Sequence, residues 1–152
     1  MAGAWEPRAF AHSQSVEREG QFSPDGHWVA YSSNESARWQ VYVVPFPGPG
    51  GKYQISTEGG QQPRWRRDGK ELFFLSLDKK LMAASVKAGA TFEFGQPTVL
   101  FQTRAREPLS AEEIFTYDVS PDGQRFLINV NLEQSNPPPV NIVLNWTSEL
   151  RR

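Results

Sequence analysis

The hexapeptide QFSPDG, residues 21–26, returns as RWRRDG at residues 64–69 and as DVSPDG at residues 118–123. In each copy a polar–apolar–polar segment leads into Asp-Gly, and the three turns are spaced by 43 and 54 residues. Proline presets the first dihedral angle of such a turn, and glycine adopts the positive φ that closes a bulged hairpin. The pattern therefore predicts the same hairpin three times along the chain.

Each turn is followed by strand-like segments. The apolar segments directly after the turns are residues 28–31, 72–75 and 126–128. A second strand candidate follows each of them, at residues 40–44, 81–86 and 141–146. Residues 52–57 and 98–103 close the first two repeats, whereas the third repeat has no such segment. Only residues 109–114 fit a short helical turn. We expect an all-β chain of three antiparallel units of about 40–50 residues, a length typical of propeller blades. A β-sandwich is the less favoured alternative, because its turns would recur every 8–12 residues or so.

Composition excludes several function classes. The chain has 152 residues, and its 16 basic and 17 acidic side chains leave a net charge of −1, so we expect no nucleic-acid partner. Cysteine is absent, which removes disulfides, thiolate nucleophiles and cysteine-based metal sites. No apolar stretch approaches the length of a membrane span, and residues 1–10 lack the pattern of a secretion signal. We therefore expect no membrane span, and the compartment stays open.

Four segments resemble a known family. FSPDGHWVAYSSNES, VYVVPFPGPGGKYQIST, QPRWRRDGKELFFL and SPDGQRFLINV resemble the TolB-like, WD40-like propeller repeats at the C-terminal end of many bacterial serine/threonine kinases and related sensor proteins. The similarity spans residues 8–152. It implies the final three blades of a six-bladed propeller that acts as a binding platform, in a family that is often extracytoplasmic. The sequence has no kinase motif, so phosphoryl transfer is not expected.

The repeats set the expected domain boundaries. We expect residues 17–57 to form the first blade, 58–103 the second, and 104–152 a third blade that lacks its outer strand. Half a ring would leave two large apolar faces in water. The simplest arrangement that covers them is a homodimer with six blades, in which blade faces meet and residues 1–16 of each chain supply a strand to a blade of the partner.

Few residues are candidates for catalysis or metal binding. His12 and His27 are the only histidines, and their spacing matches no common metal site or catalytic triad. The aspartates of the three Asp-Gly turns are explained by turn geometry rather than by metal binding. Trp65 is expected to pack in the core, and Arg64 to lie on an inner strand that faces the channel. We expect no cofactor, no metal and no catalytic residue.

Ligands of propellers usually bind at one mouth of the channel, through the loops that join one blade to the next and the second strand to the third. The candidate ligand-binding residues in and near these loops are Glu17, Arg18, Arg38, Gln62, Arg64, Arg104, Arg106 and Glu113. The favoured hypothesis is a noncatalytic scaffold that binds a protein or a peptide. The alternatives are a propeller hydrolase or lyase that uses channel-lining acids and arginines, and a fragment with no function apart from that of its parent.

Overall fold

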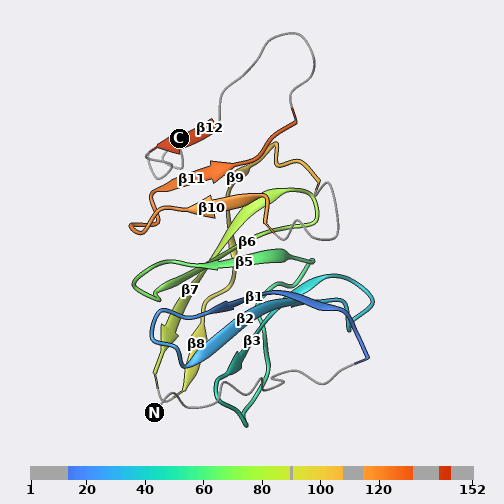
Figure 1. Cartoon of the computed structure of the whole chain (residues 1–152), viewed down its shortest axis with the longest axis vertical. Helices are drawn as coiled ribbons and strands as arrows, with labels where there is room; N and C mark the ends of the chain where they lie inside the picture. The colour runs from blue at the N-terminus through green and yellow to red at the C-terminus, as the bar shows by residue number, and fades with distance from the viewer. Residues whose placement is uncertain (1–13, 90, 108–114, 132–140, 145–152) are drawn as a thin grey trace, which may run out of the picture.

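The computed structural model describes residues 14–89, 91–107, 115–131 and 141–144. These residues form strands, turns and loops without a helix, so the prediction of an all-β chain is confirmed. The strands make three antiparallel sheets. The sheets are open rather than closed into a barrel, and they are stacked along the long axis of the molecule (Figure 1).

The first sheet has four strands in sequential order. They are β1 (Glu17–Phe22), β2 (Trp28–Ser33), β3 (Gln40–Pro45) and β4 (Tyr53–Gln54). All six residues of β2 are buried. This burial agrees with the near-continuous apolar run after the first Asp-Gly turn, since such runs are typical of strands covered on both faces.

The second sheet has five strands instead of the four predicted. They are β5 (Gln61–Trp65), β6 (Glu71–Leu75), β7 (Lys80–Ala88), β8 (Phe92–Phe94) and β9 (Thr98–Gln102). The additional strand is β8. It forms because β7 is long enough for its first half to pair with β9 while its last three residues pair with β8.

The third sheet has three described strands, β10 (Tyr117–Val119), β11 (Arg125–Ile128) and β12 (Asn141–Leu144). The predicted short helical turn at 109–114 lies outside the described residues. The same is true of residues 1–13, which hold most of the predicted exchanged strand and His12. His27 is exposed on its turn, as expected.

Hydrogen bonds within the first Asp-Gly turn account for the aspartate at this position. Asp25 Oδ1 accepts hydrogen bonds from Ser23 Oγ at 2.5 Å and from the backbone N–H of His27 at 3.0 Å. Gly26 adopts a φ of 73°. The serine hydrogen bond lowers the pKa of Asp25 more than any other contact. Within the described part of the chain, no group of three or more potential ligands is placed to hold a metal ion.

Two separate apolar clusters hold the sheets together, one on each side of β6. Leu72 and Phe74 of β6 belong to the cluster that also contains Trp28 of the first sheet. Phe73 belongs to the other cluster, together with Phe126 of the third sheet. Successive side chains of a strand point to opposite faces, so this one strand joins both clusters. The second sheet is therefore the middle layer of the stack.

Candidate functional site

The first strand of each sheet carries, or directly follows, an equivalent residue at the same end. Glu19, Gln62 and Thr116 each lie six positions before the aspartate of their turn. Glu19 and Gln62 have positive φ angles of 63° and 59°, and in both sheets the strand register shifts at this point. Such a bulge redirects a side chain. We call these three residues the inner ladder.

The inner ladder links the sheets through one repeated hydrogen-bonding step. Glu19 Oε2 accepts the backbone N–H of Gln62 at 2.7 Å and the hydroxyl of Ser32 at 2.5 Å. Gln62 Oε1 in turn accepts the backbone N–H of Thr116 at 2.7 Å and its hydroxyl at 3.0 Å. The hydroxyl of Tyr117 donates to the carbonyl oxygen of Gln62 at 2.8 Å. Each ladder side chain on one sheet thus receives the N–H of the equivalent residue on the next sheet.

The carboxyl group of Glu19 is buried, which is unusual for an ionisable side chain. Its exposed fraction is only 5%, and this burial raises its pKa above the ordinary value. The hydrogen bonds from Ser32 and from the N–H of Gln62, together with the charge of Arg18, act in the opposite direction but are smaller. Glu19 Oε2 therefore holds two sheets together.

Gln21, Arg64 and Asp118, two residues further along the chain, also link the three sheets, but through contacts between their side chains. Arg64 Nη1 donates to Gln21 Oε1 at 3.2 Å, and Arg64 Nε lies 3.7 Å from Asp118 Oδ1. The guanidinium group of Arg64 also lies over the ring of Phe115, 3.7 Å from its centroid. Trp65, the next residue of β5, packs half-buried against the first apolar cluster, in line with its predicted core role.

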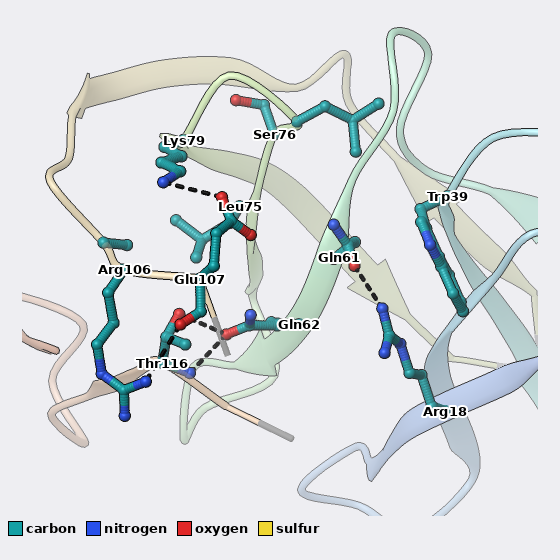
Figure 2. Close-up of a pocket in the computed structure, with 12 residues that line it drawn as sticks. Arg18, Trp39, Gln61, Gln62, Leu75, Ser76, Lys79, Arg106, Glu107 and Thr116 are labelled. Atoms are coloured by element: carbon teal, nitrogen blue, oxygen red, sulfur yellow. Dashed lines mark hydrogen bonds and ion pairs between the residues drawn. The ribbon is translucent and has the colours of Figure 1, made fainter. Parts of the chain in front are cut away.

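A cavity of about 250 Å³ opens beside Gln62, where β5 begins. In Figure 2, Arg18 of β1 and Trp39, the residue before β3, form one side, and Arg106 and Lys79 lie on the other. Arg18 Nη2 donates to Gln61 Oε1 at 2.9 Å, and its guanidinium carbon lies 4.0 Å from the centroid of the Trp39 ring. Because all three sheets or their loops contribute, the cavity exists only when the sheets are stacked.

The structure brings together some of the predicted ligand-binding residues. Arg18, Gln62 and Arg106 line the cavity. The others lie outside its lining: Glu17 is half-buried on β1, Arg64 contacts Phe115, Arg104 is exposed, and Arg38 lies 3.9 Å from Glu58 on the surface. Glu113 falls outside the described residues.

Sequence reasoning missed Trp39, Gln61 and Lys79 as members of the site. Gln61 and Lys79 lie in segments that the repeats predict as loops of the ligand-binding end, although Gln61 is the first residue of β5. The predicted ligand-binding residues are mostly arginines and acids. A usable signal exists for Gln61, since it is the repeat equivalent of Arg18 in the next sheet. Aligning every inner-strand position across the repeats identifies this pair, which the structure joins by a hydrogen bond.

Comparison of the sequence with known families finds no family model that matches, and comparison with curated proteins finds no match. No helix in the described ranges is long and apolar enough to cross a membrane.

Proposed function

We propose that the chain is a noncatalytic half of a TolB-like β-propeller, which assembles with a second copy into a six-bladed ring and serves as a scaffold for a protein or peptide ligand. The inner ladder is the observation that carries this proposal. The same hydrogen-bonding step occurs between the first and second sheets and again between the second and third. A step that repeats from sheet to sheet fits a ring of blades, in which each blade meets the next in the same way.

A second copy would continue the stack of sheets. Its first sheet would lie against the third sheet of this chain, where Thr116 occupies the ladder position but is buried, with its hydroxyl donating to Gln62 Oε1. The outward face of the third sheet also presents Leu127, which is 50% exposed. A first sheet from another copy would cover this apolar side chain. Two-fold pairing makes both junctions of the ring alike, and residues 1–16 would supply the exchanged strand.

The cavity supports binding over acid–base catalysis. Its charged lining consists of Arg18, Lys79 and Arg106 with one acid, Glu107. Lys79 Nζ lies 2.9 Å from Glu107 Oε1, so this acid is engaged in an ion pair at the surface. The buried carboxyl of Glu19 is not among the lining residues, and its Oε2 already accepts two hydrogen bonds. A hydrolase or lyase would need a carboxyl group that faces the substrate in a proton-accepting position.

The mass of the protein in solution tests the assembly. Light scattering coupled to gel filtration at micromolar concentration should give twice the chain mass of 17.2 kDa. A monomeric mass would contradict the proposal. Leu127→Asp should give a monomer because it places a charge at the proposed junction, and deletion of residues 1–16 should give a monomer or an aggregate.

Val99 provides the matched control for Leu127. It is 46% exposed on β9, at the outer edge of the second sheet and away from the proposed junctions. Val99→Asp should therefore leave the mass unchanged. Equal effects of the two substitutions on the mass would overturn the assignment of the junction to the third sheet.

A further inference from the structure

We infer that the junction between two copies is an apolar seam that the inner ladder does not cross, so that the halves of the ring separate while each chain stays folded. The seam is the contact between the outward face of the third sheet, around Leu127, and the first sheet of the other copy. This inference deepens the proposed ring assembly and rests on it.

The inner ladder ends at Thr116. Glu19 and Gln62 each direct an acceptor oxygen forward to the next sheet. Thr116 is only 2% exposed, and its hydroxyl donates to Gln62 Oε1 at 3.0 Å, which is back toward the second sheet. The threonine side chain is also shorter than that of glutamate or glutamine. Thr116 therefore completes the link to the second sheet and does not extend the ladder to another one.

The backbone at Thr116 lacks the bulge of the other two ladder positions. Glu19 and Gln62 have positive φ angles and lie at shifts of the strand register, whereas Thr116 has no positive φ. The pairing of β10 with β11 runs without a shift, and the carbonyl oxygen of Thr116 accepts the N–H of Asn129 at 2.8 Å. Because a bulge redirects a side chain, its absence leaves Thr116 without the geometry that carries the ladder forward.

Leu127 supplies the contact that the outward face of the third sheet makes instead. It lies five positions after the aspartate of its turn, as Ala30 and Phe73 do in the first and second sheets. Ala30 and Phe73 are fully buried in the apolar clusters shared with the next sheet, whereas Leu127 is 50% exposed. Two cavities of about 370 and 240 Å³ adjoin Leu127. Side chains of another sheet can pack into these hollows.

The junctions of the ring are therefore of two kinds. Within the chain, each pair of neighbouring sheets shares an apolar cluster and a buried ladder step. Between copies, only the apolar contact is present. The junction between copies also depends on protein concentration, whereas the junctions within a chain do not. Dilution should therefore open the seam before any sheet unfolds.

Light scattering over a dilution series, with circular dichroism of the same samples, tests the seam. The mass should fall from two chains to one while the far-ultraviolet signal stays unchanged. Leu127→Ala should raise the dissociation constant of the dimer by about tenfold or more, because it removes apolar contact at the seam. Val99→Ala is the matched control, since Val99 is 46% exposed on β9 and lies away from the seam. It should leave the dissociation constant unchanged.

Thr116→Val tests where the ladder ends, because it removes the hydroxyl with little change of shape. It should leave the dissociation constant unchanged. It should also lower the urea midpoint of unfolding by the same amount in the wild type and in the monomeric Leu127→Asp background. A dissociation constant raised as much as by Leu127→Ala, or a loss of midpoint confined to the dimer, would place the hydroxyl at the junction and overturn the inference.

The dilution series separates failure of the seam from failure of the ring. A dimer that dissociates only when the chains unfold contradicts the seam and leaves the ring standing. A wild type that is monomeric at every concentration contradicts both.

Discussion

Glu19 combines a buried carboxyl group with a positive φ of 63°, two features that are each unfavourable. A non-glycine residue in this backbone region costs about 1–3 kcal/mol. The conformation persists because the bulge directs the carboxyl group at the backbone N–H of Gln62 on the neighbouring sheet. At the scale of one residue, local strain is thus offset by a contact between two sheets.

Removing the acceptor of the inner ladder should destabilise the fold. Glu19→Ala leaves the N–H of Gln62 and the hydroxyl of Ser32 without this acceptor in a buried place, so we expect a loss of about 1–3 kcal/mol in the free energy of unfolding. Glu19→Gln keeps an acceptor oxygen, as Gln62 does in the next sheet, and should lose much less. Urea unfolding of both variants measures the difference, and equal losses would argue against the hydrogen-bonding role.

The raised pKa of Glu19 predicts a pH dependence of stability. Because burial raises this pKa in the folded state above the reference value of 4.5, the folded chain holds a proton that the unfolded chain has released. The resulting contribution is fully present below pH 4.5 and is lost as the pH rises through the folded-state pKa. The wild type should therefore lose stability relative to Glu19→Gln as the pH rises above 4.5. A difference that stays constant or changes in the opposite direction would contradict the direction of the shift.

At the scale of the elements, a fourth turn has the geometry of the Asp-Gly hairpins without a glycine. Between β6 and β7, Ser76 Oγ donates to Asp78 Oδ1 at 2.5 Å, and the N–H of Lys79 donates to the carbonyl oxygen of Ser76 at 3.0 Å. Lys79 has a φ of 64° where the three Asp-Gly turns have glycine. A search for Asp-Gly alone misses this turn, because the turn is held by hydrogen bonds of Ser76 and Asp78 and contains no glycine.

The turn between β2 and β3 offers a simple gain in stability. Ala37 has a φ of 64°, and its N–H donates to the carbonyl oxygen of Asn34 at 3.0 Å. Glycine adopts this φ without the steric cost of a Cβ atom, so Ala37→Gly should stabilise the fold by about 0.5–1 kcal/mol. Gly26→Ala is the reciprocal control, because Gly26 has a φ of 73° and a Cβ there would meet no other atom within 4 Å. It should destabilise the fold by a similar amount in thermal unfolding.

The sequence predicts most of the turns and strands, because these depend on local chemistry. The Asp-Gly turns and the apolar segments after them identify β2, β6 and β11. Two features could not be predicted in the same way. Strand β8 forms because β7 is long enough to pair with two partners. The bulges at Glu19 and Gln62 depend on contacts with the next sheet, which no local pattern reports.

For the whole molecule, the two apolar clusters predict that the third sheet opens independently. Phe126 is fully buried and meets Phe73 edge-on, with ring centroids 5.1 Å apart. Phe126→Ala should cost about 3–5 kcal/mol in the second cluster. Hydrogen exchange should then show loss of protection in β10 and β11 while β2, which borders the first cluster, keeps its protection.

Phe22 gives the comparison for Phe126. It is 59% exposed on β1, so removal of its ring in Phe22→Ala should cost less than about 1 kcal/mol. Loss of protection in β2 as large as that in β10, in the Phe126→Ala variant, would show that the sheets unfold as one unit.

The sequence predicts where the candidate site lies better than it predicts which residues line it. The repeats placed Arg18, Gln62 and Arg106 at one end of the strands, and the structure gathers these three around one cavity. Arg38 belongs to the same end in sequence terms, yet it lies on the surface beside Glu58. Which side chains of a loop turn inward depends on how neighbouring sheets stack, and that arrangement is not encoded in any single repeat.

The inner ladder also has a direction. The accepting side chain belongs to the earlier sheet and the donated N–H to the later one, from Glu19 to Gln62 and from Gln62 to Thr116. The two ends of the stack are therefore chemically unlike, and copies that meet through them must join head to tail. Head-to-tail contacts close into a ring or continue as a filament. The angle between successive sheets, rather than the strength of any contact, would then decide whether this chain forms a finite particle or an open polymer.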